Sequence, residues 1–424
     1  MQHKIPLQDL NANVGPMAKG MVEAIEACVH CGFCLPICPT YQVLGEEMDS
    51  PRGRIVLMKS ALEGELSVQD TLLYIDRCLG CLACVSTCPS GVCYNELVTP
   101  YRTYALRFRK ERLARRGQRM LVRQTLPHPV RFRLAARIGK LAQPLRSALP
   151  GELRGMLDML PDRMPVSQPL PEFYPAKGER RARAILLTGC VQQSLDPEIN
   201  WATLRVLAQN GVEVIIPKSQ VCCGAIMMHI GDLEEARSLA RTNFTAFPKD
   251  VDVIITNAAG CGSGMKEYEF LFTGLPEEEL AALIASKTKD ITTFLTELGL
   301  RDEPRLVEPL KVAYHDACHL AHAQGIREAP RALIKSIQGV SLIEIAESDL
   351  CCGSAGTYNL EQPEIAAQLG IRKAEKIRRS GAEAVVMGNI GCMIQIRKYL
   401  LDAPVPLPVY HTIELLDQAY KTSL

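Results

Sequence analysis

Two short runs of cysteine near the N-terminus carry the most specific chemistry in this sequence. Each run holds four cysteines in the spacing C-x2-C-x2-C-x3-C, and a proline follows the last of them at once. This spacing is typical of chains that bind two [4Fe-4S] clusters. The first run contains Cys28, Cys31, Cys34 and Cys38, and the second contains Cys78, Cys81, Cys84 and Cys88.

The spacing also predicts which thiols share a cluster. Three closely spaced thiolates can wrap one cluster in a tight loop, whereas the fourth is held away by three residues and a proline that starts a helix. We therefore expect each run to give its fourth thiol to the other cluster. Structural zinc fits less well, because it needs only four ligands, usually as two separated pairs. The predicted sets are Cys28, Cys31, Cys34 and Cys88 for cluster 1, and Cys78, Cys81, Cys84 and Cys38 for cluster 2.

The second half of the chain repeats another cysteine pattern twice. Each repeat has a cysteine after an apolar strand, then Cys-Cys-Gly, then a last cysteine after another strand. We name these the first block (residues 184–261) and the second block (residues 311–392). The glycine after each pair allows a turn in which both thiols face one metal. Four thiolates suit either zinc or a further iron–sulfur cluster. The candidate ligands are Cys190, Cys222, Cys223 and Cys261, and Cys318, Cys351, Cys352 and Cys392.

Other residues near these cysteines have weaker signals. His30 lies inside the first run but occupies no ligand position, and Cys93 belongs to no set. Three histidines surround Cys318 and could move protons or contact a quinone, although such histidines more often have structural roles. These are His315, His319 and His322.

Short apolar strands alternate with helices of 10–15 residues through both blocks, which predicts two tandem α/β domains with largely parallel sheets. The cysteines follow strand ends, where open α/β sheets place their sites. The region around the first two cysteine runs is predicted to be mainly helical, so the fold class is α+β. The expected domains are 1–101, a basic helical segment and linker over 102–180, 181–300 and 305–424.

Two N-terminal stretches have a helical pattern. Residues 1 to about 26 place Met17, Met21, Val22 and Ile25 at helical spacing. Between the cysteine runs, Ser50 is a predicted N-cap with Pro51 at the first helical position, and the helix that follows should pack between the clusters. Arg52 and Arg54 could donate to cluster sulfurs or a partner carboxylate, or form a solvated helix start.

Residues 102–140 are strongly basic, with Glu111 as the single acid among many arginines. Apolar residues interleave with the charges, so the segment could lie on an anionic membrane surface, dock on an acidic partner, or bridge two domains. Five prolines between Pro161 and Pro175 then predict a linker.

Length and composition are those of a globular protein with two to three domains in 424 residues. Lys and Arg total 48 against 47 Asp and Glu, so no net charge favours nucleic acid. The sequence has no apolar run near the roughly 18 residues of a membrane span and no signal-peptide core. We expect a cytoplasmic protein, with the inner face of the membrane as a further location. Its 17 cysteines are not expected to form disulfides, and all of them except Cys93 are predicted ligands.

Three stretches resemble the iron–sulfur subunit of bacterial glycolate oxidase (glycolate dehydrogenase): CVHCGFCLPICPTY at 28–41, DSPRGR at 49–54 and DRCLGCLACVSTCPSG at 76–91. The resemblance implies an electron-transfer subunit of a 2-hydroxy-acid oxidoreductase. A separate FAD subunit would oxidise glycolate to glyoxylate, and this chain would pass single electrons towards quinone. The sequence has no GxGxxG fingerprint after a strand, so neither FAD nor a catalytic residue is expected here.

The Cys-Cys-Gly blocks alone are shared more widely, by heterodisulfide reductase, a glycerol-3-phosphate dehydrogenase subunit and lactate-utilisation proteins. The same relay for D-lactate or glycerol 3-phosphate is therefore an alternative, as is a heterodisulfide-reductase-like subunit. In heterodisulfide reductase a CxxC pair ends each block, but Ala258 and Asn389 replace its first cysteine here. A non-cubane cluster with five thiolates is thus not expected. A zinc-structured scaffold or redox sensor is the alternative from another class.

Overall fold

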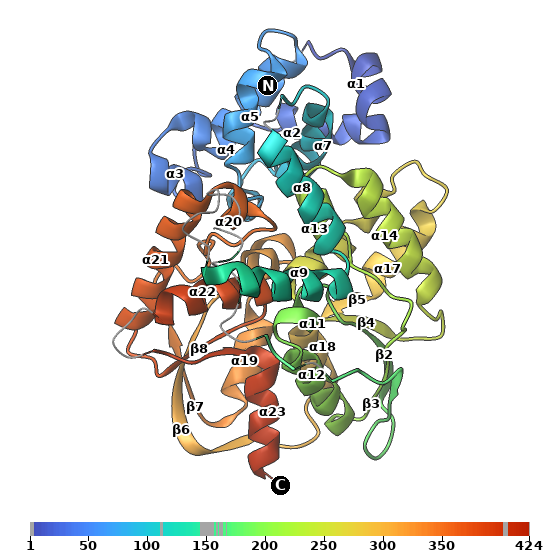
Figure 1. The fold of residues 1–424 in the computed structure, drawn as a ribbon, viewed down its shortest axis with the longest axis vertical. Helices are drawn as coiled ribbons and strands as arrows, with labels where there is room; N and C mark the ends of the chain where they lie inside the picture. Colours follow the sequence, from blue (N-terminus) through green and yellow to red (C-terminus); the bar gives the residue numbers. More distant parts are fainter. Residues whose placement is uncertain are drawn as a thin grey trace.

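The computed structural model describes residues 4–110, 113–144, 157, 160, 164–166, 168–401 and 406–423. The N-terminal helices form one end of the molecule, and two α/β halves stand side by side beneath them (Figure 1). Among the described helices, none combines the length and the apolar character that crossing a membrane requires.

The N-terminal segment forms two helices where the sequence pattern suggested one. Helix α1 (Leu7–Val14) and helix α2 (Ala18–Glu26) are separated by a 3-10 turn. Gly15 adopts φ +64° there and Pro16 cannot donate a helical hydrogen bond, so the helix is interrupted. The predicted apolar face is buried: Met17, Met21, Val22 and Ile25.

Five helices hold the two cysteine runs. They are α3 (Pro39–Leu44), α4 (Pro51–Leu62), α5 (Val68–Asp76), α6 (Ala83–Thr87) and α7 (Tyr94–Leu106). The predicted start of α4 is confirmed, because the Ser50 hydroxyl accepts the Gly53 N–H at 2.9 Å. Pro39 starts α3 as expected, but the expectation for Pro89 is wrong. Pro89 lies within a turn closed by the Gly91 N–H on the Cys88 carbonyl, and α7 begins only at Tyr94.

The basic segment forms α8 (Leu113–Thr125) and α9 (Pro129–Ala142). Helix α8 bridges both halves, since Arg119 donates to the Ile230 carbonyl at 3.1 Å and Gln118 to the Leu360 carbonyl at 3.4 Å. Arg102 differs from the other basic residues because it lies in α7 and is buried. Glu111 and Arg112, and Pro161 of the linker, lie outside the described residues.

The first half is built on a five-stranded sheet with the order β1-β3-β2-β4-β5. All neighbouring strands are parallel except β1, which is antiparallel to β3. The strands are β1 (Phe173–Tyr174), β2 (Ala182–Leu187), β3 (Val212–Ile215), β4 (Val253–Thr256) and β5 (Thr288–Asp290). The helices are α11 (Gln192–Leu195), α12 (Glu198–Gln209), α13 (Ala225–His229), α14 (Leu233–Ala246), α15 (Ala259–Lys266), α16 (Tyr268–Leu271), α17 (Glu278–Lys287) and α18 (Ile291–Leu298).

The second half repeats this plan on a fully parallel sheet with the order β7-β6-β8-β9. The prediction of largely parallel α/β sheets is thus confirmed. The strands are β6 (Arg305–Tyr314), β7 (Gln338–Glu344), β8 (Ala384–Met387) and β9 (Val409–His411). A π-helical turn (His319–Ala323) precedes α19 (Glu328–Lys335), α20 (Tyr358–Glu361), α21 (Pro363–Arg379), α22 (Ile390–Leu401) and α23 (Thr412–Ser423).

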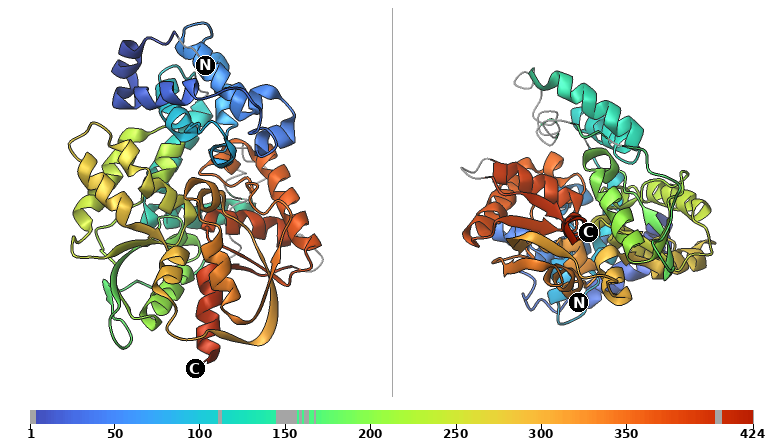
Figure 2. Two further views of the ribbon diagram at one scale, coloured as in Figure 1. Left: turned by 180° about the vertical axis from the view of Figure 1, so that it is seen from behind. Right: turned by 90° about the horizontal axis from the view of Figure 1, so that it is seen from below.

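The two sheets share one hydrophobic core, which includes Leu186 and Ile255 of the first sheet and Val312 and Val385 of the second. Helix α23 packs on α12 of the other half, and Arg205 pairs with Asp417 there at 2.7 Å. The two halves therefore form one body, and the left view in Figure 2 shows it lying against the cysteine-bearing helices.

Candidate metal centres

The first cysteine pocket lies between the two N-terminal runs. Its lining includes the four thiols predicted for cluster 1, together with His30 and the first turn of α4. The loop that carries three of these thiols is tightly wound, with φ +57° at His30 and +84° at Gly32. The thiols are Cys28, Cys31, Cys34 and Cys88.

The second cysteine pocket is adjacent to the first. Cys84, Pro51 and Tyr94 line both pockets, so the start of α4 lies between them as expected. The first pocket is lined by a group of five thiols, Cys84 included, and the second by a group of four, so each lining contains the fourth cysteine of the other run. Which thiols would share a cluster stays a prediction. The second group is Cys38, Cys78, Cys81 and Cys84.

Arg54 supplies a buried positive charge beside the second pocket. Its side chain is 1% exposed, and its Nη1 lies 3.9 Å from the Cys38 sulfur. Nη2 lies 3.2 Å from the Asp49 carboxylate, and Nε donates to the Tyr74 carbonyl at 2.7 Å. Arg54 therefore donates towards a sulfur, whereas Arg52 pairs with Glu47 at 2.8 Å nearer the surface.

The pocket contains further donors to sulfur. The Gly80 N–H lies 3.4 Å and the Tyr94 hydroxyl 3.8 Å from the Cys78 sulfur. Burial opposes ionisation of Cys78, but Arg54 and Arg102 outweigh it and lower the pKa of this thiol. Hydrogen bonds and positive charge at the sulfurs are what an anionic iron–sulfur cluster requires from its protein.

Other thiols in the pockets depend on a metal for ionisation. Burial raises the pKa of Cys34 to about 11 and the pKa values of Cys81 and Cys84 well above the usual range. A coordinated metal ion deprotonates a thiol outright. The donor set therefore fits a thiolate-ligated metal group and not free cysteines acting as nucleophiles.

The first block brings its four cysteines into one buried chain of sulfurs. The Cys222 sulfur lies 3.2 Å from that of Cys190, and the Cys223 sulfur is hydrogen-bonded to the thiols of Cys222 and Cys261. Hydrogen bonds from those two neighbours lower the pKa of Cys223 well below its usual value. Gly224, at φ +83°, supplies the predicted turn, and a Cβ there would lie 3.1 Å from a helix α14 carbonyl.

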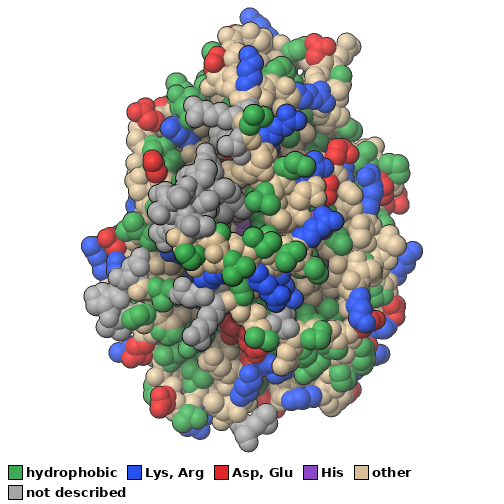
Figure 3. All heavy atoms as spheres, in the orientation of Figure 1, with side chains coloured by type: hydrophobic (Ala, Val, Ile, Leu, Met, Phe, Trp, Pro, Cys, Tyr) green, Lys and Arg blue, Asp and Glu red, His purple; other side chains and the backbone are tan. Residues whose placement is uncertain are grey.

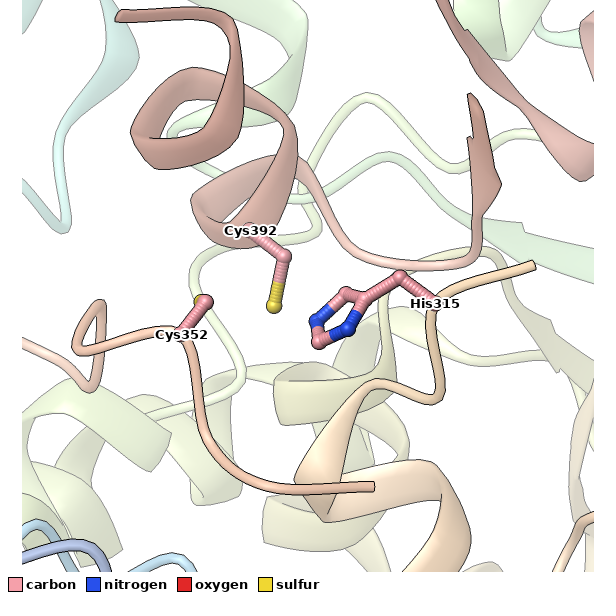
Figure 4. A group of neighbouring side chains, drawn as sticks. All are labelled: His315, Cys352 and Cys392. Atoms are coloured by element: carbon pink, nitrogen blue, oxygen red, sulfur yellow. The ribbon is translucent and has the colours of Figure 1, made fainter. Parts of the chain in front are cut away.

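The second block differs by including a histidine. His315, Cys352 and Cys392 point towards one another from three segments (Figure 4), with one ligand atom of each within 4.8 Å of the other two. Burial, followed by the effect of Lys373, lowers the pKa of His315 to about 3, so the ring is neutral. Cys318 and Cys351 continue the chain of thiols at 3.9 Å.

Sequence reasoning did not identify His315 as a metal ligand. Its signal is its position directly after β6, at the strand end where the cysteines of both blocks also lie. Asn389, which replaces the first cysteine of a CxxC pair, lies 3.5 Å from the Cys392 sulfur through its amide nitrogen. It therefore acts as a hydrogen-bond donor to a thiol.

Three histidines from the two α/β halves hydrogen-bond to the loop that carries the second cysteine run. His229 Nε2 lies 2.9 Å from the Leu79 carbonyl, and His319 Nε2 lies 3.0 Å from the Gly80 carbonyl. His322 Nδ1 lies 2.7 Å from the Ser86 hydroxyl. These contacts give His319 and His322 structural roles. The loop thereby places Cys81 in one buried cluster with Cys318 and Cys351 of the second block.

Cys93 stands apart from all of these groups. Its side chain is exposed at the start of α7, and its sulfur lies 3.8 Å from the Gly91 carbonyl. It lines neither cysteine pocket.

Two family descriptions match the chain. A "4Fe-4S dicluster domain" matches residues 24–92, and a "Cysteine-rich domain" matches residues 184–266 and again 312–397. The glycolate oxidase iron-sulfur subunit of Escherichia coli is 37% identical over 406 residues, covering 93% of this chain and 94% of the relative. The probable glycolate oxidase iron-sulfur subunit of Bacillus subtilis is 37% identical over 391 residues, covering 87% and 88%. Lactate utilization protein A of Oceanobacillus iheyensis is 30% identical over 234 residues, covering 55% of this chain and 95% of the relative.

Proposed function

The chain belongs to the family of glycolate oxidase iron–sulfur subunits, and we propose that it receives electrons from an FAD-containing partner subunit that oxidises glycolate to glyoxylate. It passes them to a quinone or another respiratory acceptor. A [4Fe-4S] cluster, when bound, carries one electron at a time, which suits a flavin that can release two electrons singly.

The observation that carries this proposal is the pair of adjacent cysteine pockets. They share Cys84 and the start of α4. Cys28, Cys31, Cys34 and Cys88 would hold one cluster, and Cys38, Cys78, Cys81 and Cys84 the other. Arg54, the Gly80 N–H and the Tyr94 hydroxyl would donate to the second group. The two Cys-Cys-Gly blocks would hold additional metal as zinc or a further cluster.

The relation to lactate utilization protein A supports the same relay with D-lactate as a second candidate. That relative matches 55% of this chain, whereas the glycolate oxidase subunits match most of it, so glycolate is the favoured substrate.

We expect glycolate to bleach the visible iron–sulfur absorbance of the protein purified anaerobically with its co-purifying partner. Electrons released by the partner would reduce the clusters held by this chain, whereas the isolated chain should not respond. D-lactate and glycerol 3-phosphate, added in separate samples, are the controls for substrate. Bleaching by one of these two compounds alone would identify that compound, and not glycolate, as the electron donor. No bleaching, with flavin and clusters intact, would contradict the proposed reaction.

An exposed apolar stripe on α9 supports a contact with the membrane that contains the quinone. Four side chains at positions i, i+4, i+8 and i+11 share one helix face and are 59–82% exposed. Exposed arginines lie on α8 and α9 beside them, and Figure 3 shows hydrophobic side chains gathered over α9 with Lys and Arg nearby. We propose that this stripe, Val130, Leu134, Ile138 and Leu141, rests on anionic lipid, because the basic residues complement its charge.

Replacing Leu134 and Ile138 together by serine is expected to weaken binding of the full chain to phosphatidylglycerol vesicles by roughly tenfold or more. Each buried aliphatic side chain is worth about 1.5–3 kcal/mol, and 1.4 kcal/mol is about tenfold in affinity. Flotation with the vesicles measures the effect, and added salt should weaken binding further. Val307→Ser, which removes a 77% exposed side chain from β6, is the matched control. Equal binding to neutral and anionic vesicles, or none to either, would contradict the proposal.

A further inference from the structure

We propose that the second block binds a single zinc ion through Nε2 of His315 and the thiolates of Cys352 and Cys392. This inference deepens the proposed function, because it names the group that one of the two blocks holds. The three residues come from the end of β6, the Cys-Cys-Gly turn and the start of α22, and all three are 2% exposed or less.

The hydrogen bonds of His315 leave one ring nitrogen ready for a metal. Nδ1 lies 3.1 Å from the Ser348 carbonyl, an acceptor, so the proton is on Nδ1 and the lone pair is on Nε2. Nε2 is buried and has no hydrogen-bond partner in the structure. A buried polar atom without a partner is costly. Donation from the second ring nitrogen to a backbone carbonyl is the usual arrangement of a metal-ligating histidine.

The spacing of the donors fits one ion better than a four-iron cluster. Two thiolates about 2.3 Å from one tetrahedral zinc lie about 3.7 Å apart, and the three donor atoms here are all within 4.8 Å of one another. A cubane spreads its thiolates farther, because each binds a different iron. Within the described residues, no three thiols of either N-terminal pocket lie as close together.

Neighbouring groups add hydrogen-bond donors to such a site. Lys373 is 2% exposed and donates to the Ser348 carbonyl. The same carbonyl accepts the hydrogen bond from Nδ1 of His315. Cys351 contacts Cys352 and could fill the fourth position as a third thiolate. The Lys373 amine adds a donor group beside the thiolates of this site. The Asn389 amide near the Cys392 sulfur adds a donor to that thiolate.

The first block has no nitrogen ligand at the corresponding place. Thr188 is the residue directly after β2, and its N–H donates to the Gln220 side chain at 3.0 Å. The two blocks therefore differ in donor chemistry. The proposal predicts a mixed nitrogen and sulfur site in the second block alone.

The test is zinc analysis of the full-length chain, purified anaerobically and exposed to Zn²⁺ and then to a competing chelator. We expect retained zinc whose X-ray absorption shows nitrogen at about 2.0–2.1 Å and sulfur at about 2.3 Å. His315→Gln should lower zinc affinity by at least roughly 10- to 100-fold, because that is already the loss when only a hydrogen-bond partner of a metal ligand is removed. The iron content of this variant should equal that of the wild-type chain, because the proposed site holds no iron.

Two further variants separate ligation from folding. His315→Cys should keep the zinc and convert its shell to sulfur alone. His411→Gln is the matched control, because His411 is equally buried but both of its ring nitrogens are hydrogen-bonded, to the Asn257 carbonyl and the Ile413 N–H. It should leave the zinc unchanged.

Three results would overturn the proposal: wild-type protein that takes up no zinc, a wild-type shell of sulfur alone, or zinc retained unchanged by His315→Gln. Loss of iron as well as zinc in His315→Gln would indicate a folding defect. The X-ray absorption spectrum of the wild-type protein and the zinc content of His315→Cys would then test the proposal. None of these measurements involves glycolate or the partner subunit. Failure of the glycolate experiment would therefore not affect the zinc result, and failure of the zinc experiment would not affect the proposed electron transfer.

Discussion

Replacing Cys81 by serine is expected to stop glycolate-dependent quinone reduction while the partner's flavin is still reduced by glycolate. Cys81 is 8% exposed and lines the second pocket with Cys38, Cys78 and Cys84. A serine hydroxyl does not ionise in such a buried place, so the pocket would lose one of its four thiolate ligands. The two activities are measured on one preparation, by flavin absorbance in single turnover and by steady-state reduction of a soluble quinone.

Cys93→Ser is the matched control, since Cys93 lies in the same region but is exposed and lines neither pocket. This variant should keep both activities at the wild-type level. Wild-type quinone reduction by Cys81→Ser would contradict the assignment of Cys81 to the relay. Loss of flavin reduction in the same variant would instead show that the complex had not assembled.

The local features of the site could be predicted from the sequence because short-range geometry determines them. Cysteine spacing limits which thiols can share a loop, and each of the two pockets is lined by thiols from both runs. Gly224 and Gly353 follow the paired cysteines at φ +83° and +90°, conformations that favour glycine at both turns. The Ser50 cap of α4 is likewise local, because its hydroxyl accepts the N–H of a residue only three positions along the chain.

Contacts between distant segments could not be predicted in this way. Arg102 looked like part of the basic segment, but its guanidinium is buried against the Cys78 and His229 carbonyls at 2.5 and 2.9 Å. The free lone pair of His315 depends on a carbonyl 33 residues away. Pro89 shows the other limit, because the same Cys-Pro pair starts a helix after the first run and a turn after the second.

Replacing Arg54 by methionine is expected to destabilise the chain by about 3–5 kcal/mol, the usual cost of removing one partner from a buried ion pair. Asp49 is fully buried, and its remaining ion-pair partner among the residues that the structure describes would be Arg77, whose side chain is 27% exposed. The Tyr74 carbonyl would also lose its donor. Urea unfolding of the full chain, followed anaerobically by circular dichroism, gives the change in free energy.

Arg52→Met provides the matched comparison from the same motif. Arg52 is 28% exposed and pairs with Glu47, which is 43% exposed, so its loss should cost no more than about 1 kcal/mol. Changing Asp49 to leucine together with Arg54→Met should recover part of the lost stability, because an apolar pair replaces the uncompensated charge. Equal losses for Arg52→Met and Arg54→Met, or no recovery in the double variant, would contradict the role of Arg54 as the buried countercharge of Asp49.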